Sequence, residues 1–445
     1  MGPVETPVTT QNAPENTSSS SPQALPGDFV VRASIAVLLG TLLLRLAGGL
    51  ALSSLGLYLN SLGAQGAGIA WVAAGYYATE LLLAPVFGAL SDRYGRKIFL
   101  VLAPLLGAIA LVLYPHASSV AVLFAIRVLE GVSAGGAIPA TLGYLSDLTD
   151  GSKFRSRIMG LFEVVTLVGV AIGGTVLGPR VWDAFGTGSF AALAVLYVLG
   201  ALVFAFFLPQ IGLRVHRRRT WSDYARALAN RRILRFMPAW FAATGVIGLW
   251  LVHVQSQLYQ GKPGFPATAV PGQNLVASLD GPGISLVLGS FAVAFLAGLF
   301  FGSRPNAGRK STVMLQAGAG LMTIAVCLFL LNHPELGLDW RVPLPIIGEA
   351  RGWFLVLLIG AFFQAGFTPV ALAYLADISQ DFPEDRGVVV GLYSIFLAGG
   401  NLIGGSLLGG PFVQVLHMDG IALLTGLFTL VAFASVINIR RTSSD

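Results

Sequence analysis

Twelve long apolar stretches are the feature that most constrains the fold of this chain. Each is close to the roughly 20 apolar residues that a helix needs to cross a bilayer. Inside a bilayer every backbone amide needs a partner within the protein, which favours helices over open strands. We therefore predict an all-α membrane protein with twelve transmembrane helices. The stretches cover residues 33–59, 69–90, 97–115, 119–143, 157–178, 188–208, 236–258, 283–302, 311–332, 353–376, 387–411 and 420–439.

The composition argues against other classes of protein. Apolar residues make up 55% of the 445 residues and charged residues 11%, whereas roughly a quarter of a typical soluble domain is charged. This argues against a soluble enzyme, a disordered chain and a disulfide scaffold, and the single cysteine, Cys327, allows no internal disulfide. Because the sequence contains no Walker motif, convincing catalytic triad or metal cluster, we expect no enzymatic activity, no cofactor and no metal.

The distribution of Lys and Arg predicts the orientation in the membrane. With twelve spans, both termini lie on one side. If that side is the cytoplasm, the cytoplasmic segments carry 21 of the 27 basic residues, and the other side carries only Arg180, Lys262, Arg341 and Arg351. Cytoplasmic loops are enriched in Lys and Arg, so we expect cytoplasmic termini in a plasma membrane, with a bacterial inner membrane favoured. The same asymmetry explains the basic charge without a nucleic-acid partner.

The chain divides into five regions. Residues 1–28 form a polar tail without Lys or Arg, which predicts disorder, and residues 440–445 form a short cytoplasmic tail. Two bundles of six helices, 29–208 and 236–439, flank a cytoplasmic linker, 209–235, that contains eight arginines. The linker has two interpretations: a basic segment that sets topology, which we favour, or a surface helix over 220–235. Either would attract anionic lipid headgroups.

The two halves share an internal repeat. Tyr144-Leu145-Ser146-Asp147 ends the fourth stretch, and Tyr374-Leu375-Ala376-Asp377 ends the tenth. Arg155 and Arg386 follow, and each begins a glycine series whose members are 231 residues apart. The paired glycines are Gly160 and Gly391, Gly169 and Gly400, Gly173 and Gly404, Gly174 and Gly405, and Gly178 and Gly409. Two parallel bundles related by duplication are a transporter architecture, with a site between them near the midplane.

The segment from Gly88 to Lys97, Gly-Ala-Leu-Ser-Asp-Arg-Tyr-Gly-Arg-Lys, resembles the signature between the second and third spans of the major facilitator superfamily. The resemblance extends over nearly the whole chain apart from the tail. It implies that Asp92, Arg96 and Asp147 form a charged cluster at the cytoplasmic rim. This cluster is expected to hold the halves together when the pore faces outward. Gly88 is expected to allow close helix packing and Gly95 a tight turn. The residues of this cytoplasmic gate are Gly88, Asp92, Arg93, Gly95, Arg96, Asp147 and Glu163. In the alternative, the basic residues only set topology.

Two further motifs bear on coupling. The run Arg127-Val128-Leu129-Glu130-Gly131 resembles the family's intramembrane motif linked with proton coupling. The glycine series on the fifth span resembles a motif of proton-driven exporters, although Gly174 and Leu177 depart from it. Close packing of helices explains those glycines equally well. The sugar-porter motif after the sixth span is missing, because the chain continues Leu208-Pro209-Gln210-Ile211.

Charged side chains inside the spans need a partner or a wet cavity. The spans contain Arg45, Glu80, Arg127, Glu130, Glu163 and His253. By the helical rise, Arg45 and Glu80 lie roughly 18 Å and 16 Å from the cytoplasmic ends of their spans, so they could pair. Arg127 and Glu130 can share a helix face. We take Glu80, Glu130, Arg45 and Arg127 as proton-coupling candidates, with a fixed structural ion pair as the alternative, and His253 as a structural group.

Aromatic and amide side chains in the spans would suit an amphipathic or lipophilic ligand. The binding candidates are Tyr76, Tyr77, Trp250, Gln255, Phe363, Gln364, Tyr393 and Asn401, each of which could instead face lipid or a helix seam. We predict a proton-coupled exporter of such small molecules that works by alternating access as a monomer among membrane lipids. Alternatives are a symporter or uniporter importing a polar or anionic metabolite, and less favourably a channel or receptor.

Overall fold

The computed structural model describes residues 26–442 except 65, 151, 153, 212–224, 227, 261–269, 303–309, 337–339, 345–347 and 381–385. Much of the predicted tail 1–28 and of the basic linker 209–235, and half of the tail 440–445, therefore lie outside the described residues. The end of the linker is described, however, and Arg231–Arg235 form the start of a long helix rather than a loop.

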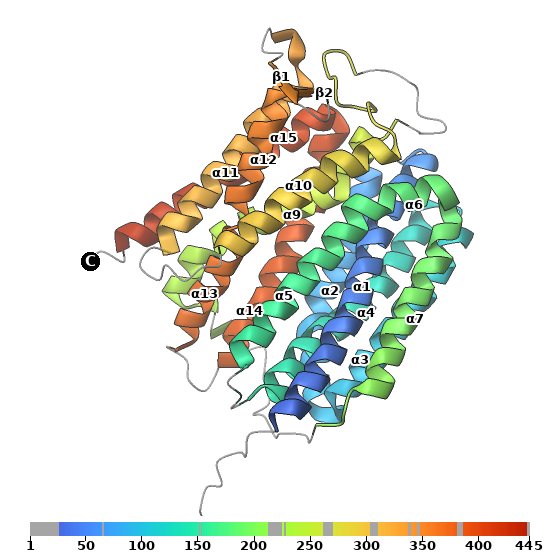
Figure 1. Cartoon of the computed structure of the whole chain (residues 1–445), viewed down its shortest axis with the longest axis vertical. Coiled ribbons are helices and arrows are strands. Elements are labelled where there is room, and N and C mark those ends of the chain that lie inside the picture. Colours follow the sequence, from blue (N-terminus) through green and yellow to red (C-terminus); the bar gives the residue numbers. More distant parts are fainter. Residues whose placement is uncertain are drawn as a thin grey trace, which may run out of the picture.

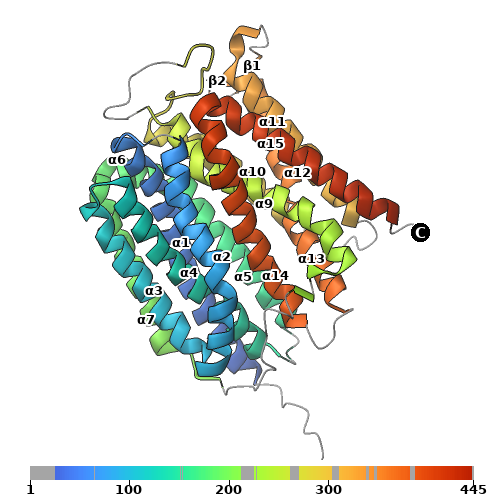
Figure 2. The same ribbon diagram turned by 180° about the vertical axis from the view of Figure 1, so that it is seen from behind.

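The first bundle (blue to green in Figure 1) packs α1 against α5 and α7, and α4 against α2 and α3. Figure 2 shows the same bundle from behind, with α3 and α7 on its outer side. Its elements are α1 (Gly27–Ser61), α2 (Gly66–Tyr94), α3 (Arg96–Leu113), η1 (Tyr114–His116), α4 (Val120–Leu148), α5 (Arg155–Ala171), the π-helical turn η2 (Ile172–Leu177), α6 (Gly178–Phe185), η3 (Gly186–Gly188) and α7 (Ser189–Phe207).

The second bundle repeats this arrangement and adds a short antiparallel hairpin, in which Arg341 pairs with Arg351. Its helix α9 packs against α14 and α15, and α11 packs against α12 and α15. Its elements are α9 (Arg231–Leu258), α10 (Gly281–Gly302), α11 (Lys310–Asn332), η4 (Pro334–Leu336), β1 (Arg341–Leu344), β2 (Gly348–Arg351), α12 (Gly352–Gln364), α13 (Phe367–Gln380), α14 (Arg386–Asn401), the π-helical turn η5 (Leu402–Leu408) and α15 (Gly409–Thr442).

The predicted all-α membrane fold is confirmed. The described residues contain ten helices that are long and apolar enough to cross a membrane. Two of them, Arg157–Phe207 and Ser394–Arg441, contain 51 and 48 residues, about twice the length of one crossing. Each turns back at a residue with positive φ, Gly186 at 51° and His417 at 52°. Ten helices are therefore consistent with twelve passes.

The glycine repeat has a common structural role in both bundles. Gly173 and Gly174 lie in η2 against α1, and Gly404 and Gly405 lie in η5 against α9. A Cβ atom on Gly173 would meet the carbonyl oxygen of Leu46, and one on Gly404 would meet that of Gly245. The glycines therefore let two backbones touch, and the same close contact recurs 231 residues later.

We expect Gly173→Ala to lower the free energy of unfolding by about 1–3 kcal/mol, because its methyl group overlaps the α1 backbone. Gly160→Ala is the matched control, since a Cβ atom on Gly160 would meet nothing within 4 Å. Alanine is favoured over glycine in a free helix by about 0.5–1 kcal/mol, so this control should be neutral or stabilised. Thermal unfolding of both variants in detergent tests this, and equal melting temperatures would contradict it.

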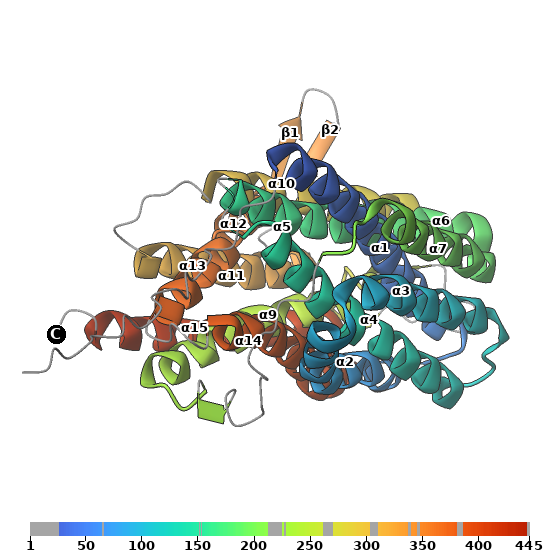
Figure 3. The same cartoon turned by 90° about the horizontal axis from the view of Figure 1, so that it is seen from below.

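The two bundles lie side by side (Figure 3). We call the end with Gly27, Arg96 and Arg231 the basic end, and the end with β1 and β2 the hairpin end. The helix α10 contacts η2 and α6 far more than α5, and α2 contacts η5 and α15. In Figure 1, α11 and α7 diverge away from the hairpin. The described conformation is therefore closed at the hairpin end.

Candidate functional site

Arg96 organises the charged cluster at the basic end. Its Nη2 atom lies 2.8 Å from Oδ1 of Asp92, and its Nε atom lies 2.8 Å from Oδ2 of Asp147. The sequence places these residues at the end of α2, the start of α3 and the end of α4, so one guanidinium group ties three helices together. All three belong to the first bundle. The two ion pairs of Arg96 therefore join helices within the first bundle.

The other predicted gate residues have different surroundings. Gly95 adopts φ 101° between α2 and α3, as expected for a tight turn. In the described conformation a Cβ atom on Gly88 would make an ordinary 3.6 Å contact with Pro139. Arg93 lies exposed over the ring of Tyr94. Glu163 is half-buried in α5, and Arg96 pairs with Asp92 and Asp147 instead of with it.

The second bundle has a simpler version of the cluster. Lys310, the counterpart of Lys97, forms an ion pair with Asp377, the counterpart of Asp147. Its ammonium group also donates to the carbonyl oxygen of Ala373 at 3.3 Å. The repeat therefore preserves a contact between the start of α11 and the end of α13, without an acid equivalent to Asp92.

A buried polar network lies inside the first bundle. The Nη1 atom of Arg127 donates to Oε2 of Glu130 at 2.7 Å, and the hydroxyl of Tyr114 donates to the same oxygen at 2.6 Å. Arg127 and Glu130 are each 3% exposed. The guanidinium group of Arg127 also lies over the ring of Tyr76, 4.5 Å from its centroid. Glu130 is thus held in a fixed pair.

Glu80 differs from Glu130 in having no polar partner. It is 6% exposed, and the described part of the chain offers its carboxyl group no hydrogen bond or ion pair. Within the described residues no ion pair joins Glu80 to Arg45, whose Cβ atom packs against Gly169 of α5. The charges of Arg45 and Arg127 nevertheless both act on Glu80. The carboxyl group of Glu80 is thus within electrostatic reach of two cations but forms no ion pair with either in the described residues.

Three of the predicted binding residues lie in aromatic surroundings. Tyr76 and Tyr77 pack edge to face with their ring centroids 5.2 Å apart. Tyr77 is buried, whereas Tyr76 is half-buried beside Arg127. In the second bundle, Trp250 stacks on Phe291 at 5.2 Å and donates to the hydroxyl of Thr425 at 3.1 Å. The first bundle thus combines aromatic rings with charge, whereas Trp250 has only neutral partners.

Gln255 belongs to a seal between the bundles. It accepts from the hydroxyl of Ser53 at 2.5 Å and donates to the carbonyl oxygen of Gly174 at 2.5 Å. Two turns further along α1, Asn60 donates to the carbonyl oxygen of Ser256 at 3.3 Å. A glutamine held by two such bonds is not available to bind a substrate in this conformation. Its observed contacts are those of a closure residue.

Asp183 provides a second part of the seal. Its Oδ1 atom accepts from the hydroxyl of Tyr259 at 2.6 Å, and its Oδ2 atom accepts from the amide of Gly281 at 3.0 Å. Ala67 also donates to the side chain of Gln414 at 3.1 Å. These bonds cross between the bundles at the hairpin end.

The remaining candidates lie in the second bundle. Phe363 is 47% exposed, and Gln364 is buried in the seam where a Cβ atom on Gly320 would meet its backbone. Asn401 is buried against Gly248, and its Oδ1 atom has no hydrogen-bond partner in the described structure. The side chain of Tyr393 lies outside the described residues. The expected structural role of His253 agrees with its burial and its 2.8 Å contact with the carbonyl oxygen of Gly405.

Sequence reasoning missed the partners that the fold brings together. Tyr114 reaches Glu130 from the end of α3, and Asp183 reaches Tyr259 from the other half of the chain. Neither Tyr114 nor Asp183 belongs to a recognisable motif. An acid at the end of an apolar stretch and a tyrosine before a proline are common at membrane boundaries, so no sequence signal distinguished them.

Comparison with known proteins identifies the family. The family model described as Major Facilitator Superfamily matches residues 37–348. The chain belongs to this superfamily of membrane transporters. Multidrug resistance protein 2 of Bacillus subtilis (strain 168) is 23% identical over 380 residues, covering 82% of this chain and 85% of that protein. Quinolone resistance protein NorA of Staphylococcus aureus (strain MSSA476) is 22% identical, covering 82% and 86%.

Solved structures support the same fold. The nucleoside transporter NupG superposes with a TM-score of 0.63 at 15% identity, covering 91% of this chain and 98% of NupG. The human organic anion transporter MFSD10 (TETRAN) superposes with a TM-score of 0.61 at 18% identity, covering 93% and 100%. These similarities extend over the whole transporter and concern the fold alone.

Proposed function

We propose that this member of the superfamily is a proton-coupled exporter of amphipathic or lipophilic small molecules and that Glu80 carries the proton. The single observation behind this proposal is the buried, unpaired carboxyl group of Glu80 near two arginines. A buried carboxyl group without a partner favours its protonated form, and an approaching cation favours release of the proton. A small movement of Arg45, which forms no ion pair within the described residues, would therefore switch Glu80 between the two forms.

The proposed cycle uses the two ends of the molecule in turn. In our proposal the basic end is cytoplasmic and the hairpin end extracellular, in the plasma membrane of a bacterium. Contacts of Gln255 and Asp183 then close the outside while substrate enters from the cytoplasm. Closure of the cytoplasmic gate, built on Arg96, Asp92 and Asp147, alternates with this seal. Each monomer contains both gates and needs no partner subunit for the cycle.

The proposed substrate class follows from the different surroundings of the candidate residues. Tyr76 lies beside the charges of Arg127 and Glu80, whereas Trp250 lies beside Phe291 and a hydroxyl group. A molecule with one polar and one apolar part would suit both sides. The relatives named for multidrug and quinolone resistance favour the same class. Aromatic surfaces of this kind tolerate varied ligands.

Transport direction tests the proposal. Cells that express the chain should accumulate less of a lipophilic fluorescent dye than cells with an empty vector, because export opposes passive entry. A protonophore should abolish the difference, since the cycle has no other source of energy. We expect a severalfold difference in steady-state fluorescence. Greater accumulation in the expressing cells would contradict export.

Import of an anionic metabolite is the second candidate, and Arg45 favours it. Arg45 forms no ion pair within the described part of the chain, although it is half-buried. A half-buried cation without an ion pair among the described residues suits a carboxylate or phosphate ligand. Uptake of a labelled organic anion that depends on Arg45 would support this candidate over export.

A further inference from the structure

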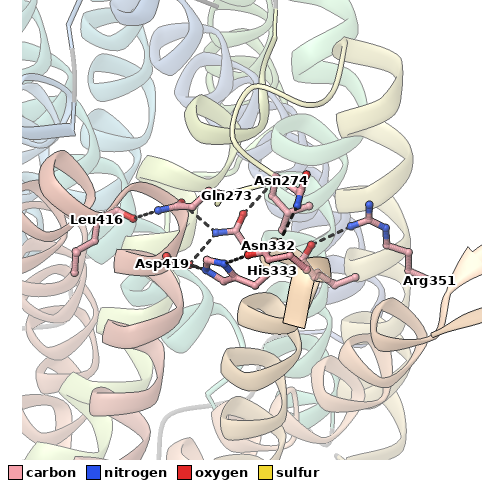
Figure 4. Close-up of polar contacts among 10 residues, drawn as sticks. Gln273, Asn274, Asn332, His333, Arg351, Leu416 and Asp419 are labelled. Carbon is pink, nitrogen blue, oxygen red and sulfur yellow. Dashed lines mark hydrogen bonds and ion pairs between the residues drawn. The ribbon is translucent and has the colours of Figure 1, made fainter. Parts of the chain in front are cut away.

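A clasp of polar side chains closes the hairpin end of the second bundle. Figure 4 shows His333 pointing at Asp419, with Asn332 and Gln273 beside them. The Nδ1 atom of His333 lies 2.8 Å from Oε1 of Glu335. Its Nε2 atom lies 2.9 Å and 3.0 Å from the two carboxylate oxygens of Asp419. These three residues come from the end of α11, from η4 and from the turn within α15.

Two carboxylates facing both ring nitrogens define the state of the histidine. A carboxylate only accepts hydrogen bonds, so both nitrogens of His333 must carry a hydrogen at the same time, and only the charged imidazolium does so. Partial burial opposes the charge, but hydrogen bonds to Glu335 and Asp419 outweigh it and raise the pKa of His333 above its ordinary value. Arg351 lies nearby but donates to the carbonyl oxygen of Leu331.

The clasp is joined to residues 270–280, which directly precede α10. Asn332 donates to Oδ1 of Asp419 at 2.8 Å and to Oε1 of Gln273 at 3.1 Å, and its own Oδ1 atom accepts from the amide of Leu275 at 2.9 Å. Gln273 also accepts from the amide of Met418 at 3.1 Å. The end of α11 and the turn within α15 thus hold the loop through Gln273 and Leu275.

The same loop leads directly to the seal between the bundles. The amides of Ala277 and Leu279 donate to the carbonyl oxygens of Gln257 and Leu258 at 2.8 Å and 2.9 Å. Gly281, two residues later, donates to Asp183 of the first bundle. Ala277 is held at φ 53°, a conformation that residues with a side chain rarely adopt. A loop held in this conformation would relax when its attachments loosen.

We propose that His333, Asp419 and Glu335 form a proton-operated clasp that locks residues 270–280 ahead of α10 and so stabilises closure of the hairpin end. The clasp builds on the proposed alternating access but does not use Glu80. The hydrogen bonds of the clasp raise the pKa of His333. The stabilisation of the closed state by the clasp is therefore complete below the ordinary pKa of about 6.5. It is lost as the pH rises through the raised value. Acid on the hairpin side therefore keeps that end closed.

Cysteine labelling in lipid nanodiscs tests the clasp. Replacing the only cysteine, in Cys327→Ser, allows a single reporter, Ser256→Cys, at the α1–α9 contact, where Ser256 is 1% exposed. The rate of its reaction with a maleimide is divided by the rate for the unfolded protein at the same pH. This quotient reports how readily the hairpin end opens. We expect about three- to tenfold faster labelling at pH 8.5 than at pH 5.5, because the raised pKa links protonation to closure.

Three variants of the reporter protein separate the possible causes. His333→Gln should label equally fast at both pH values, whereas the matched control His116→Gln, at an exposed histidine in η1, should keep the pH ratio. Glu80→Gln should also keep it, so failure of the proton site leaves the clasp testable. A ratio that survives in His333→Gln, or that vanishes in Glu80→Gln, would overturn the clasp.

Hydrogen exchange on the unmodified protein provides a test that needs no variant. The amides of Ala277 and Leu279, after correction for the intrinsic pH dependence of exchange, should be protected about three- to tenfold more at pH 5.5 than at pH 8.5. The amide of Ala117, bonded to the carbonyl oxygen of Tyr114 in the first bundle, is the internal reference. Equal protection of the loop at both pH values would rule the clasp out.

Discussion

Glu80→Gln is expected to abolish uphill, gradient-driven transport while substrate exchange across the membrane continues. Glutamine keeps the size and polarity of the side chain but can neither take up nor release the proton. Loss of a positioned proton-transfer group costs about 100-fold or more in rate, so we expect at least that loss of accumulation in proteoliposomes with an imposed pH gradient. Exchange of labelled for unlabelled substrate should remain within about twofold, because it needs no net proton movement.

The control for this variant is Glu349→Gln, which makes the same chemical change at an exposed position of β2. It should transport as the wild type does. The proton site would be wrongly assigned if Glu80→Gln still accumulated substrate against its gradient. Loss of both exchange and accumulation would indicate that Glu80 binds substrate rather than the coupling proton.

Breaking the buried pair should have the largest effect on stability. Arg127→Met removes the cation and leaves Glu130 with Tyr114 alone in the interior of the first bundle. Removal of one partner from a buried ion pair typically costs about 3–5 kcal/mol, whereas replacing both by apolar residues is often neutral. We therefore expect a large fall in the melting temperature of Arg127→Met, and recovery in the double variant Arg127→Met with Glu130→Leu.

The exposed pair of Arg341 and Glu349 provides the comparison. The Nη1 atom of Arg341 lies 3.5 Å from Oε2 of Glu349, and the two side chains are 57% and 65% exposed. An ion pair that is this exposed contributes about 0–1 kcal/mol to stability. Arg341→Met should therefore leave the melting temperature almost unchanged. In Arg127→Met the expected source of instability is the buried carboxylate of Glu130, which has lost its cation. A double variant of Arg127 and Glu130 that is no more stable than Arg127→Met would contradict this.

The fold could be predicted because its signals are local. Apolar length marks each crossing, and the glycine repeat marks the seams in which η2 meets α1 and η5 meets α9. The cluster of Asp92, Arg96 and Asp147 could be predicted for the same reason, since two of its members belong to one sequence motif.

The partners of single side chains could not be predicted in the same way. Arg45 and Glu80 lie at similar depth, and the rise per residue gives that depth, but depth does not specify which way each side chain points around its helix. In the described residues Arg45 forms no ion pair with Glu80, although its charge acts on that carboxyl group. Gln255 was predicted to bind substrate because an amide side chain can hydrogen-bond either to a ligand or to the protein. Only the packing of α1 against α9 shows that Gln255 bonds to the protein in this conformation.

Proton release by the purified protein tests the central claim most directly. Amphipathic cations, neutral lipophiles and organic anions would be added in turn to weakly buffered protein, with the wild type and Glu80→Gln compared. We predict that a cation or a neutral lipophile releases about one proton per bound molecule from the wild type and none from Glu80→Gln. Binding without proton release, or equal release from both proteins, would contradict proton coupling through Glu80. Binding of an anion that depends on Arg45 would then favour import.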